Sequence, residues 1–441
     1  MSPAVKHERL DGPAGSSLLI EENHDLPLVR VQVALRVGAG DDPPELDGLT
    51  NFASELMGRG AGGRTRAQLD AAFDALGTSL DVMSDYDAVT FDFTVLKERL
   101  EPALTLMADV LLRPDFPGDE SEKLKREIAA QLDEMRDDDG QLARRFFTRA
   151  LYHTHPYGRT VIGTEQSLPA LSLEGARRWH AESLRGGNIV FGVAGDVVAG
   201  AAADAILRHF AKLPAGGGEP GARPLVPRRS GMRITLVDKP ERSQSQILLG
   251  QPAPRWQDPD FLALQVATTV FGGTFTARLM DEVRSKRGLS YGASARVGQG
   301  RGAKALVAHV FPSLDQTAET LELVLALWRD WVEEGVTEKE VAFARGYLAK
   351  SFAFSVATPE DRLELRTALE LGGMPADFAD TFAARVQKVE RADAQRALKS
   401  NLTARDLEIV IVSTVDELRP KLEAAGLLKD ATVEVVEYDS Y

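Results

Sequence analysis

The chain contains no cysteine, which excludes disulfide bonds and thiol chemistry. It also lacks an apolar run long enough to cross a membrane, and residues 1–7 lack the apolar core of a signal peptide. Basic residues are in the minority, with 52 Lys and Arg against 66 Asp and Glu, and the formal charge of −14 argues against a nucleic-acid backbone as the main partner. We therefore expect a cytoplasmic protein without a membrane span or a nucleic-acid partner, or a periplasmic one if a leader has been removed.

The length and composition indicate two globular domains. The chain has 441 residues, more than one hydrophobic core usually supports, and 44% of them are hydrophobic. Residues 214–224 read PAGGGEPGARP, a glycine- and proline-rich stretch without periodicity, as expected of a connector. The sequence predicts a first domain at 1–213, a linker at 214–229 and a second domain at 230–441.

The two predicted domains repeat one order of elements. Alternating strands at 29–37, 89–95 and 189–193 correspond to strands at 247–249, 306–311 and 409–412. Leu104 and Leu321 lie on corresponding helices 217 residues apart, and Gly195 and Ser413 follow corresponding strands 218 residues apart. The pattern predicts a tandem duplication in which each half is an α+β sandwich of helices on a mostly antiparallel sheet. The alternative is that the two halves are unrelated, because any two α+β domains share some similarity in the order of their strands and helices.

Residues 49–57 have the pattern of an amphipathic helix. Its apolar stripe repeats every three or four residues and consists of Leu49, Phe52, Ala53, Leu56 and Met57. Asn51, Ser54 and Glu55 share the opposite face, where side chains one turn apart converge. This face has the geometry of a site.

The stretch G-L-T-N-F-A-S-E-L-M at 48–57 resembles the G-L-x-H-F-x-E-H-M helix of the insulinase/pitrilysin family, whose inverted H-x-x-E-H signature binds zinc. Asn51 stands in place of the first His, Ser54 in place of the Glu that activates water, and Glu55 in place of the second His. The family's third ligand is a Glu on a later helix, and the alignment puts Gln131 there, with Glu127 and Glu134 the nearest carboxylates.

These replacements remove the chemistry of the site. An amide is a poor zinc ligand, a serine hydroxyl is no general base without a base of its own, and one carboxylate does not replace three strong donors. We expect no zinc and no autonomous hydrolysis from this chain.

A second motif lies at 271–291, F-G-G-T-F-T-A-R-L-M-D-E-V-R-S-K-R-G-L-S-Y. Its spacing predicts a helix that buries Phe275, Leu279 and Val283 and ends at Gly288. The strand that follows is expected to carry Tyr291, Ala293 and Ala295 on one face, close to Arg284.

This motif is similar to the family pattern G-G-x-x-x-S-R-L-x-x-x-x-R-x-x-x-G-L-x-Y, with Ala277 in place of Ser. The resemblance implies that Arg284 and Tyr291 face the zinc site of a paired domain and bind substrate or the developing oxyanion. The alternative is a structural pair, an Arg at a helix C-terminus and a Tyr that caps the core.

The resemblance implies two homologous domains of the mitochondrial-processing-peptidase-like metallohydrolase fold that close around a peptide. It further implies a zinc-less partner subunit of a heterodimeric metallopeptidase, in which a catalytic subunit supplies H-x-x-E-H and the zinc and cleaves an unstructured peptide. A homodimer is also compatible with the sequence. The alternative is a structural or peptide-binding clamshell without any proteolytic role.

Two weaker motifs have structural explanations that require no ligand. Residues 58–65, GRGAGGRT, imitate a phosphate-binding loop but follow a helix instead of a buried strand, and Thr65 with Gln68 fits a helix N-cap better. His153 and His155 are spaced to hold a metal on an extended segment, but no third ligand is evident. The insulinase/pitrilysin family has a related H-P-Y-G turn as a structural feature, and the resemblance favours a structural turn over a metal site.

Overall fold

The computed structural model describes residues 7–218 and 221–440, which form two compact units. The first unit takes its residues from Met1–Leu132, Arg159–Gly221 and Phe354–Ala379. The second unit takes its residues from Asp133–Gly158, Ala222–Ala353 and Asp380–Tyr441. Each unit therefore contains a segment from the other half of the chain, which the continuous ranges predicted from the sequence do not include.

The first unit is built on a six-stranded sheet with the order β1-β2-β8-β3-β7-β6. Its strands are β1 (His7–Asp11), β2 (Ser17–Glu22), β3 (Leu28–Leu35), β6 (Asp81–Ser84), β7 (Val89–Leu96) and β8 (Ile189–Gly195). All neighbours are antiparallel except β2 and β8, which are parallel. The alternation predicted for residues 29–37 and 89–95 is thus confirmed as two adjacent central strands.

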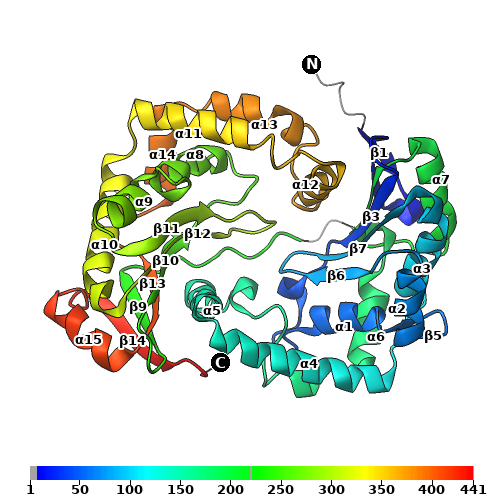
Figure 1. The fold of residues 1–441 in the computed structure, drawn as a ribbon, viewed down its shortest axis with the longest axis horizontal. Coiled ribbons are helices and arrows are strands. Elements are labelled where there is room, and N and C mark those ends of the chain that lie inside the picture. Colours follow the sequence, from blue (N-terminus) through cyan, green and yellow to red (C-terminus); the bar gives the residue numbers. More distant parts are fainter. Residues whose placement is uncertain (1–6, 219–220, 441) are drawn as a thin grey trace. The chain divides into compact units, whose positions relative to one another are not determined.

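Helices cover both faces of this sheet (Figure 1). They are α1 (Leu49–Met57), α2 (Arg66–Asp74), α3 (Leu100–Leu112), α4 (Gly118–Asp137, which runs on into the second unit), α6 (Leu173–Ser183), α7 (Ala199–His209) and α12 (Pro359–Leu371). The main core lies on the face where Val29, Val31 and Val33 meet α1 and α3. The opposite face carries Ala34 and Val190 and is covered by α12.

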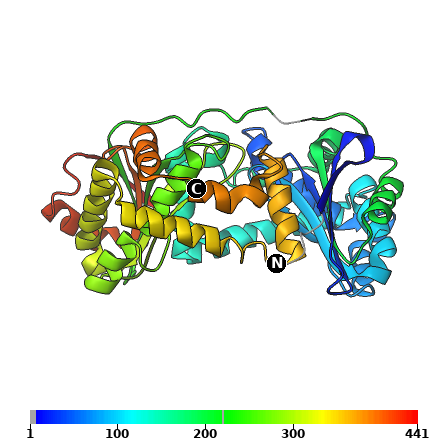
Figure 2. The same ribbon diagram turned by 90° about the horizontal axis from the view of Figure 1, so that it is seen from above.

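Helix α12 comes from the second half of the chain and packs on β2 and β8 (Figure 2). Leu363 enters the apolar cluster of the sheet, and Gly192 of β8 allows this approach, because a Cβ there would lie 2.7 Å from Leu363 Cδ1. Ion pairs border the contact. Arg362 binds Glu21 of β2, and Glu370 accepts hydrogen bonds from Arg36. A helix and a sheet distant in sequence thus share one core.

The second unit has its own six-stranded sheet, with the order β11-β12-β10-β13-β9-β14. Its strands are β9 (Met232–Asp238), β10 (Gln246–Pro252), β11 (Ser290–Val297), β12 (Ala305–Pro312), β13 (Glu408–Ser413) and β14 (Ala431–Glu437). Strand β9 runs parallel to β13 and β14, and the other pairs are antiparallel. The two sheets together confirm the predicted α+β fold with mostly antiparallel sheets.

Helices also cover this second sheet. They are α5 (Asp139–Tyr152), α8 (Phe261–Gly272), α9 (Arg278–Met280), α10 (Thr317–Glu334), α11 (Glu338–Ser351), α13 (Phe378–Gln387), α14 (Arg391–Asn401) and α15 (Val415–Ala424). A π-helical turn, Asp281–Lys286, continues α9. Phe271 of α8 stacks on Trp331 of α10 with ring centroids 4.4 Å apart, and Trp328 packs against both. Helix α5, from the first half of the chain, packs on β10 and β13.

The two sheets share one topology. Strands β2, β8, β3, β7 and β6 correspond in order and direction to β9, β13, β10, β12 and β11. Only the outermost strand differs, since β1 pairs antiparallel to β2 whereas β14 pairs parallel to β9. The exchanged helices begin at Asp139 and Pro359, 220 residues apart, close to the repeat length of the strands. These correspondences support the predicted duplication, which stays a prediction.

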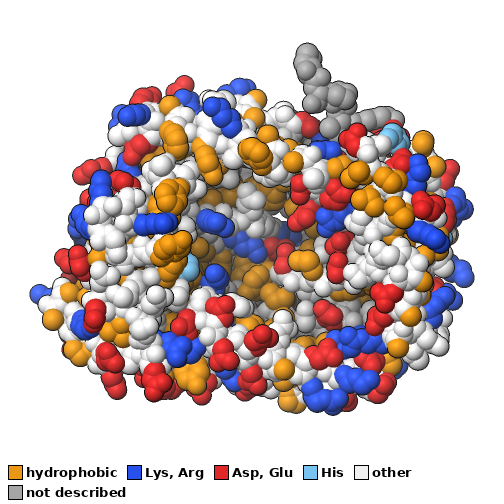
Figure 3. Space-filling view, in the orientation of Figure 1, with side chains coloured by type: hydrophobic (Ala, Val, Ile, Leu, Met, Phe, Trp, Pro, Cys, Tyr) orange, Lys and Arg blue, Asp and Glu red, His pale blue; other side chains and the backbone are white. Residues whose placement is uncertain are grey.

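Acidic and basic side chains are interspersed over the face shown in Figure 3. Among the residues that the structure describes, none of the helices combines the length and the apolar character needed to cross a membrane.

Candidate functional site

Helix α1 is fixed at its start by a carboxylate that the sequence analysis did not anticipate. Asp42 accepts hydrogen bonds from the backbone N–H groups of Gly48 (3.1 Å) and Thr50 (3.0 Å) and from the Thr50 hydroxyl (2.6 Å). Burial raises the pKa of Asp42 to about 7, although these hydrogen bonds favour its charged form. The indole N–H of Trp179 also donates to the Thr50 hydroxyl. The helix is therefore held rigidly.

The three degenerate positions lie on α1 as the spacing predicts, but none is poised for hydrolysis. Asn51 and Ser54 are buried, and Glu55 is half-buried. The Ser54 hydroxyl donates to the Asn51 carbonyl (3.1 Å) and lies 3.0 Å from the hydroxyl of Ser84 on β6. No base contacts it among the described residues. Burial raises the pKa of Glu55, with Arg59 acting in the opposite direction.

Helix α4 brings Glu127, and not Gln131, toward α1. Gln131 is exposed, whereas Glu127 binds the guanidinium of Arg59, with Nη1 and Oε1 3.1 Å apart. Glu120, two turns earlier on the same face, lies 3.7 Å from Arg59 and 3.3 Å from Arg66. Within 7–218 and 221–440, no group of three or more His, Cys, Asp or Glu side chains has the geometry of a metal site.

A hollow of about 260 Å³ lies beside these charges. Its walls include Glu55, Arg59 and Arg66, together with the apolar side chains of Leu69 and Phe73. The charged groups at the end of α1 are therefore reachable from solvent, whereas the Ser54 hydroxyl lies in the core.

In the second unit, the structure brings Arg284 and Tyr291 together. The Arg284 guanidinium carbon lies 4.5 Å from the centroid of the Tyr291 ring and 4.9 Å from that of Phe275. Both rings are well exposed, at 78% for Tyr291 and 63% for Phe275. A guanidinium over aromatic rings is favoured by cation–π attraction, which holds the side chain in place while its edge stays open. We call Phe275, Arg284 and Tyr291 the aromatic corner.

Two details of this corner differ from the sequence analysis. Phe275 was predicted to be buried in the helix, which is wrong, because the helix begins only at Arg278 and Phe275 precedes it. Tyr291 was predicted to share a face with Ala293 and Ala295, which is also wrong. The pairing of β11 with β12 shifts register between Ser290 and Ala293, and such a bulge turns the intervening side chains outward.

Comparisons with known proteins place the chain in a family. A family model described as Insulinase (Peptidase family M16) matches residues 17–165, and one described as Peptidase M16 inactive domain matches residues 170–348. Models of one peptidase family thus match about three quarters of the chain. The chain belongs to the insulinase family. It is a member in which the H-x-x-E-H signature is absent.

Two relatives of this insulinase-family chain carry different names. An uncharacterized zinc protease of Mycobacterium leprae is 29% identical over 343 residues, which is 76% of each chain. A Helicobacter pylori protein named a non-peptidase homolog is 24% identical over 414 residues, 93% of this chain and 94% of the relative.

Solved structures share the fold. The structure of a peptidase M16 inactive domain from Pseudomonas fluorescens superposes with a TM-score of 0.86 at 24% identity, covering 92% of this chain and 97% of that one. The structure of a protease from Helicobacter pylori gives a TM-score of 0.84 at 17% identity, covering 93% and 100%. The metallohydrolase-type fold predicted for the insulinase family is confirmed.

The other arginine of the insulinase-family motif, Arg278, has a structural partner. It forms a two-pronged ion pair with Glu340 of α11, at 2.6 and 2.7 Å. Glu340 also accepts a hydrogen bond from the backbone N–H of Thr337 and completes the N-terminal capping box of α11. Although burial acts to raise it, the pKa of Glu340 falls to about 2, because these donors favour the carboxylate.

We therefore expect an acid-sensitive contribution from Glu340. Because the pKa of Glu340 is lower in the folded state, its ionised carboxylate stabilises the second unit. This contribution is complete at pH values above the ordinary pKa of 4.5, and it disappears as pH falls toward about 2. The full contribution to the free energy of unfolding is at most about 3 kcal/mol. In denaturant titrations, the stability difference between wild type and Glu340→Gln should stay constant from pH 7 to about pH 5 and then shrink toward pH 3. Glu338→Gln, an exposed change in the same turn, is the control. A constant difference for Glu340→Gln would contradict the assignment.

The glycine-rich segment after α1 is a hairpin. Strands β4 (Gly60–Ala61) and β5 (Arg64–Thr65) pair through Gly62 and Gly63, which adopt the left-handed conformation. The backbone N–H of Gly63 donates to Asp115 and that of Gly62 to the Arg113 carbonyl, so these donors are not available to a phosphate. The predicted N-cap of α2 by Thr65, with Gln68 in a capping box, is confirmed.

His153 and His155 follow the end of α5. His155 is buried, and its Nδ1 accepts from the backbone N–H of Tyr157 (3.1 Å) while its Nε2 lies 3.0 Å from the Pro224 carbonyl. Both ring nitrogens are thus engaged in the packing of the turn. The structural explanation of this histidine pair is the better supported one.

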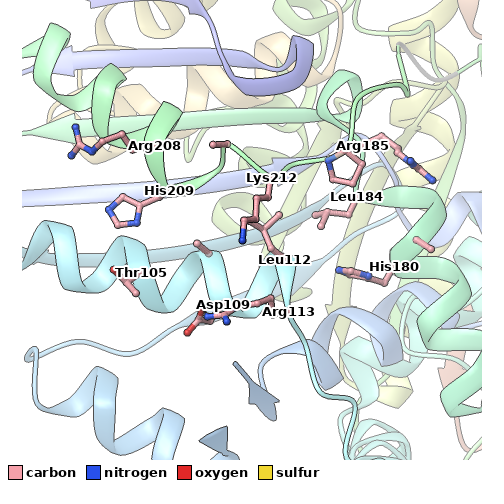
Figure 4. A pocket seen from close by; sticks show the side chains of 14 residues that line it. Thr105, Asp109, Leu112, Arg113, His180, Leu184, Arg185, Arg208, His209 and Lys212 are labelled. Atoms are coloured by element: carbon pink, nitrogen blue, oxygen red, sulfur yellow. Dashed lines mark hydrogen bonds and ion pairs between the residues drawn. The ribbon is translucent and has the colours of Figure 1, made fainter. Parts of the chain in front are cut away.

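Another hollow of the first unit, about 660 Å³, lies among α3, α6 and α7 (Figure 4). Its basic residues follow or end these helices, as Arg113 does for α3 and Arg185 for α6. His180 Nε2 lies 2.7 Å from the Leu111 carbonyl in the last turn of α3. Cations at helix C-termini complement the negative end of the helix dipole, which accounts for this charge without a ligand.

Proposed function

We propose that this chain is the zinc-less partner subunit of a two-subunit M16 peptidase. A catalytic M16 subunit with H-x-x-E-H would hold the zinc and cleave an unstructured peptide. In this chain, Arg284 and Tyr291 would bind the substrate and stabilise the negative charge that develops on the scissile carbonyl oxygen. The observation that carries the proposal is the exposed aromatic corner.

The corner has the properties that substrate recognition requires. Arg284 is held between two rings, and its guanidinium donates to no protein group within the described part of the chain. Its planar set of N–H donors is therefore available to a peptide carbonyl or carboxylate. Donors that are positioned beforehand contribute most when charge develops on an oxygen during the reaction.

The first unit supports the division of labour. Ser54 is buried in contact with Ser84, and the carboxylates Glu120 and Glu127 are occupied by arginine side chains. The carboxylates of α4 are therefore occupied, and the Ser54 hydroxyl has no base in contact within the described residues. We therefore assign the hydrolytic step to a partner and expect no zinc in this chain.

The proposal is tested by reconstitution. The chain is purified alone and together with a co-encoded M16 protein that carries H-x-x-E-H, and cleavage of an unstructured fluorogenic peptide is measured with and without a chelator. We expect background activity from this chain alone and a gain of at least tenfold for the mixture over the catalytic protein alone, abolished by the chelator. Chelator-sensitive activity from this chain alone, or a mixture without complex and without gain, would refute the proposal.

A second candidate function is a peptide-binding protein without a proteolytic role, which the name of the Helicobacter pylori relative favours. It predicts that the chain alone binds unstructured peptides in a fluorescence anisotropy titration and that no M16 partner increases cleavage. The reconstitution separates the two, because only the subunit proposal requires a gain of activity.

A further inference from the structure

The insulinase family implies zinc at the end of α1, and the residues present do not fit it. We infer that Arg59, assisted by Arg66, supplies the positive charge at this place, so that an internal cation links α1 to α4 where a metal would otherwise be needed. This inference does not depend on the proposed partner subunit.

Three carboxylates create the need for a cation. Glu55 lies on α1, and Glu120 and Glu127 lie two turns apart on one face of α4. Burial raises the pKa of Glu55, and repulsion by Glu127 acts in the same direction. Like charges that face each other between two helices are unfavourable unless a cation lies among them.

Arg59 has the position to provide that cation. It follows α1 by two residues, lies one turn after Glu55, and its side chain is only 8% exposed. Its guanidinium grips Glu127 through two nitrogens and lies 3.7 Å from Glu120. A buried arginine in two-pronged contact with a carboxylate is a fixed structural element and not a mobile surface charge.

Arg66 adds a second positive charge beside the carboxylates of α4. Its Nη1 lies 3.3 Å from Glu120 and 3.5 Å from Glu127. Lys123, with Nζ 2.5 Å from Glu120 Oε1, adds a third positive charge on α4 itself, and the two guanidinium groups supply the positive charge that links α4 to α1. They also join the end of α1 and the start of α2 to α4, and α1 and α4 are the helices that carry the degenerate positions. Helix packing here therefore needs no metal, and a metal has no vacant place among these carboxylates.

A double-mutant cycle tests the structural role. Arg59→Gln should lower the thermal midpoint by about 4 °C or more, because it removes a buried guanidinium and its two-pronged contact with Glu127, which Arg66 replaces only in part. Glu127→Gln in the Arg59→Gln background should recover part of this loss. Arg64→Gln, which removes an ion pair with Asp109 outside the cluster, is the matched control and should not be rescued by Glu127→Gln. Additive effects of Arg59→Gln and Glu127→Gln would overturn the inference.

A gain-of-site experiment tests the replacement of the metal. Asn51→His with Glu55→His places two imidazoles one turn apart on α1, and zinc binding is measured by calorimetry, with circular dichroism to check folding. The same pair combined with Arg59→Gln should bind zinc at least tenfold more tightly, because the competing cation is gone. Equal affinity in the two backgrounds would overturn the inference, and if neither binds zinc, the double-mutant cycle decides.

Discussion

Arg362→Met is expected to destabilise the first unit by about 3–5 kcal/mol, as is typical when a buried ion pair loses one member. Glu21 is 1% exposed, and Arg362 reaches its Oε1 through Nε (2.8 Å) and Nη2 (2.6 Å). The other oxygen, Oε2, is buried and has no hydrogen-bond partner. Without the guanidinium, a carboxylate remains charged inside the contact between α12 and the sheet, or takes up a proton at a cost in free energy.

Denaturant unfolding followed by circular dichroism measures this effect. Arg178→Met is the control, because Arg178 and Glu174 form an exposed pair on α6, for which we expect less than 1 kcal/mol. The double variant Glu21→Gln with Arg362→Met should recover at least half of the loss, since the amide carries no charge. A loss for Arg362→Met as small as that for Arg178→Met would show that the pair does not hold α12 on the sheet.

Arg284→Ala should lower kcat/KM of the reconstituted peptidase by 10- to 100-fold, an effect of about 1.4 to 3 kcal/mol on the transition state. This expectation rests on the proposed function. Arg284→Lys should recover only part of the activity, because an ammonium keeps the charge but loses the planar set of donors and the stacking on Tyr291.

The control for this prediction is Arg287→Ala. Arg287 follows the same π-helical turn and binds Glu282, outside the aromatic corner. We expect a change of no more than about twofold in kcat/KM, as for a surface pair of little energetic weight. Equal losses for Arg284→Ala and Arg287→Ala would indicate a structural effect of the turn. An unchanged kcat/KM for Arg284→Ala would remove this residue from the site.

Local sequence signals predicted the elements that carry the candidate site. The apolar stripe of 49–57 gave helix α1, the alternation of 89–95 gave β7, and Thr65 with Gln68 gave the start of α2. Each of these signals arises from neighbours within one or two turns, so the sequence contains it. The glycine at 288 likewise ends the helical turn, with a φ of +63°.

The parts that could not be predicted depend on contacts across the chain. The periodicity of α12 shows that it has an apolar face but not that this face packs on the first sheet. The bulge that exposes Tyr291 has no distinctive residue, because it depends on how β11 and β12 pair. The choice between Gln131 and Glu127 is a matter of one helical turn, which the Arg59 contact decides and an alignment by spacing does not.

The exchange of α12 also sets an order of events during synthesis on the ribosome. All strands of the first sheet have been made once residue 195 is complete, but the helix that covers its second face begins at residue 359. Until then, Leu19, Ala34 and Val190 have no helix over them. Exposed apolar sheet surface favours aggregation of nascent chains. The first half of this protein is therefore expected to depend on chaperones until most of the chain has emerged.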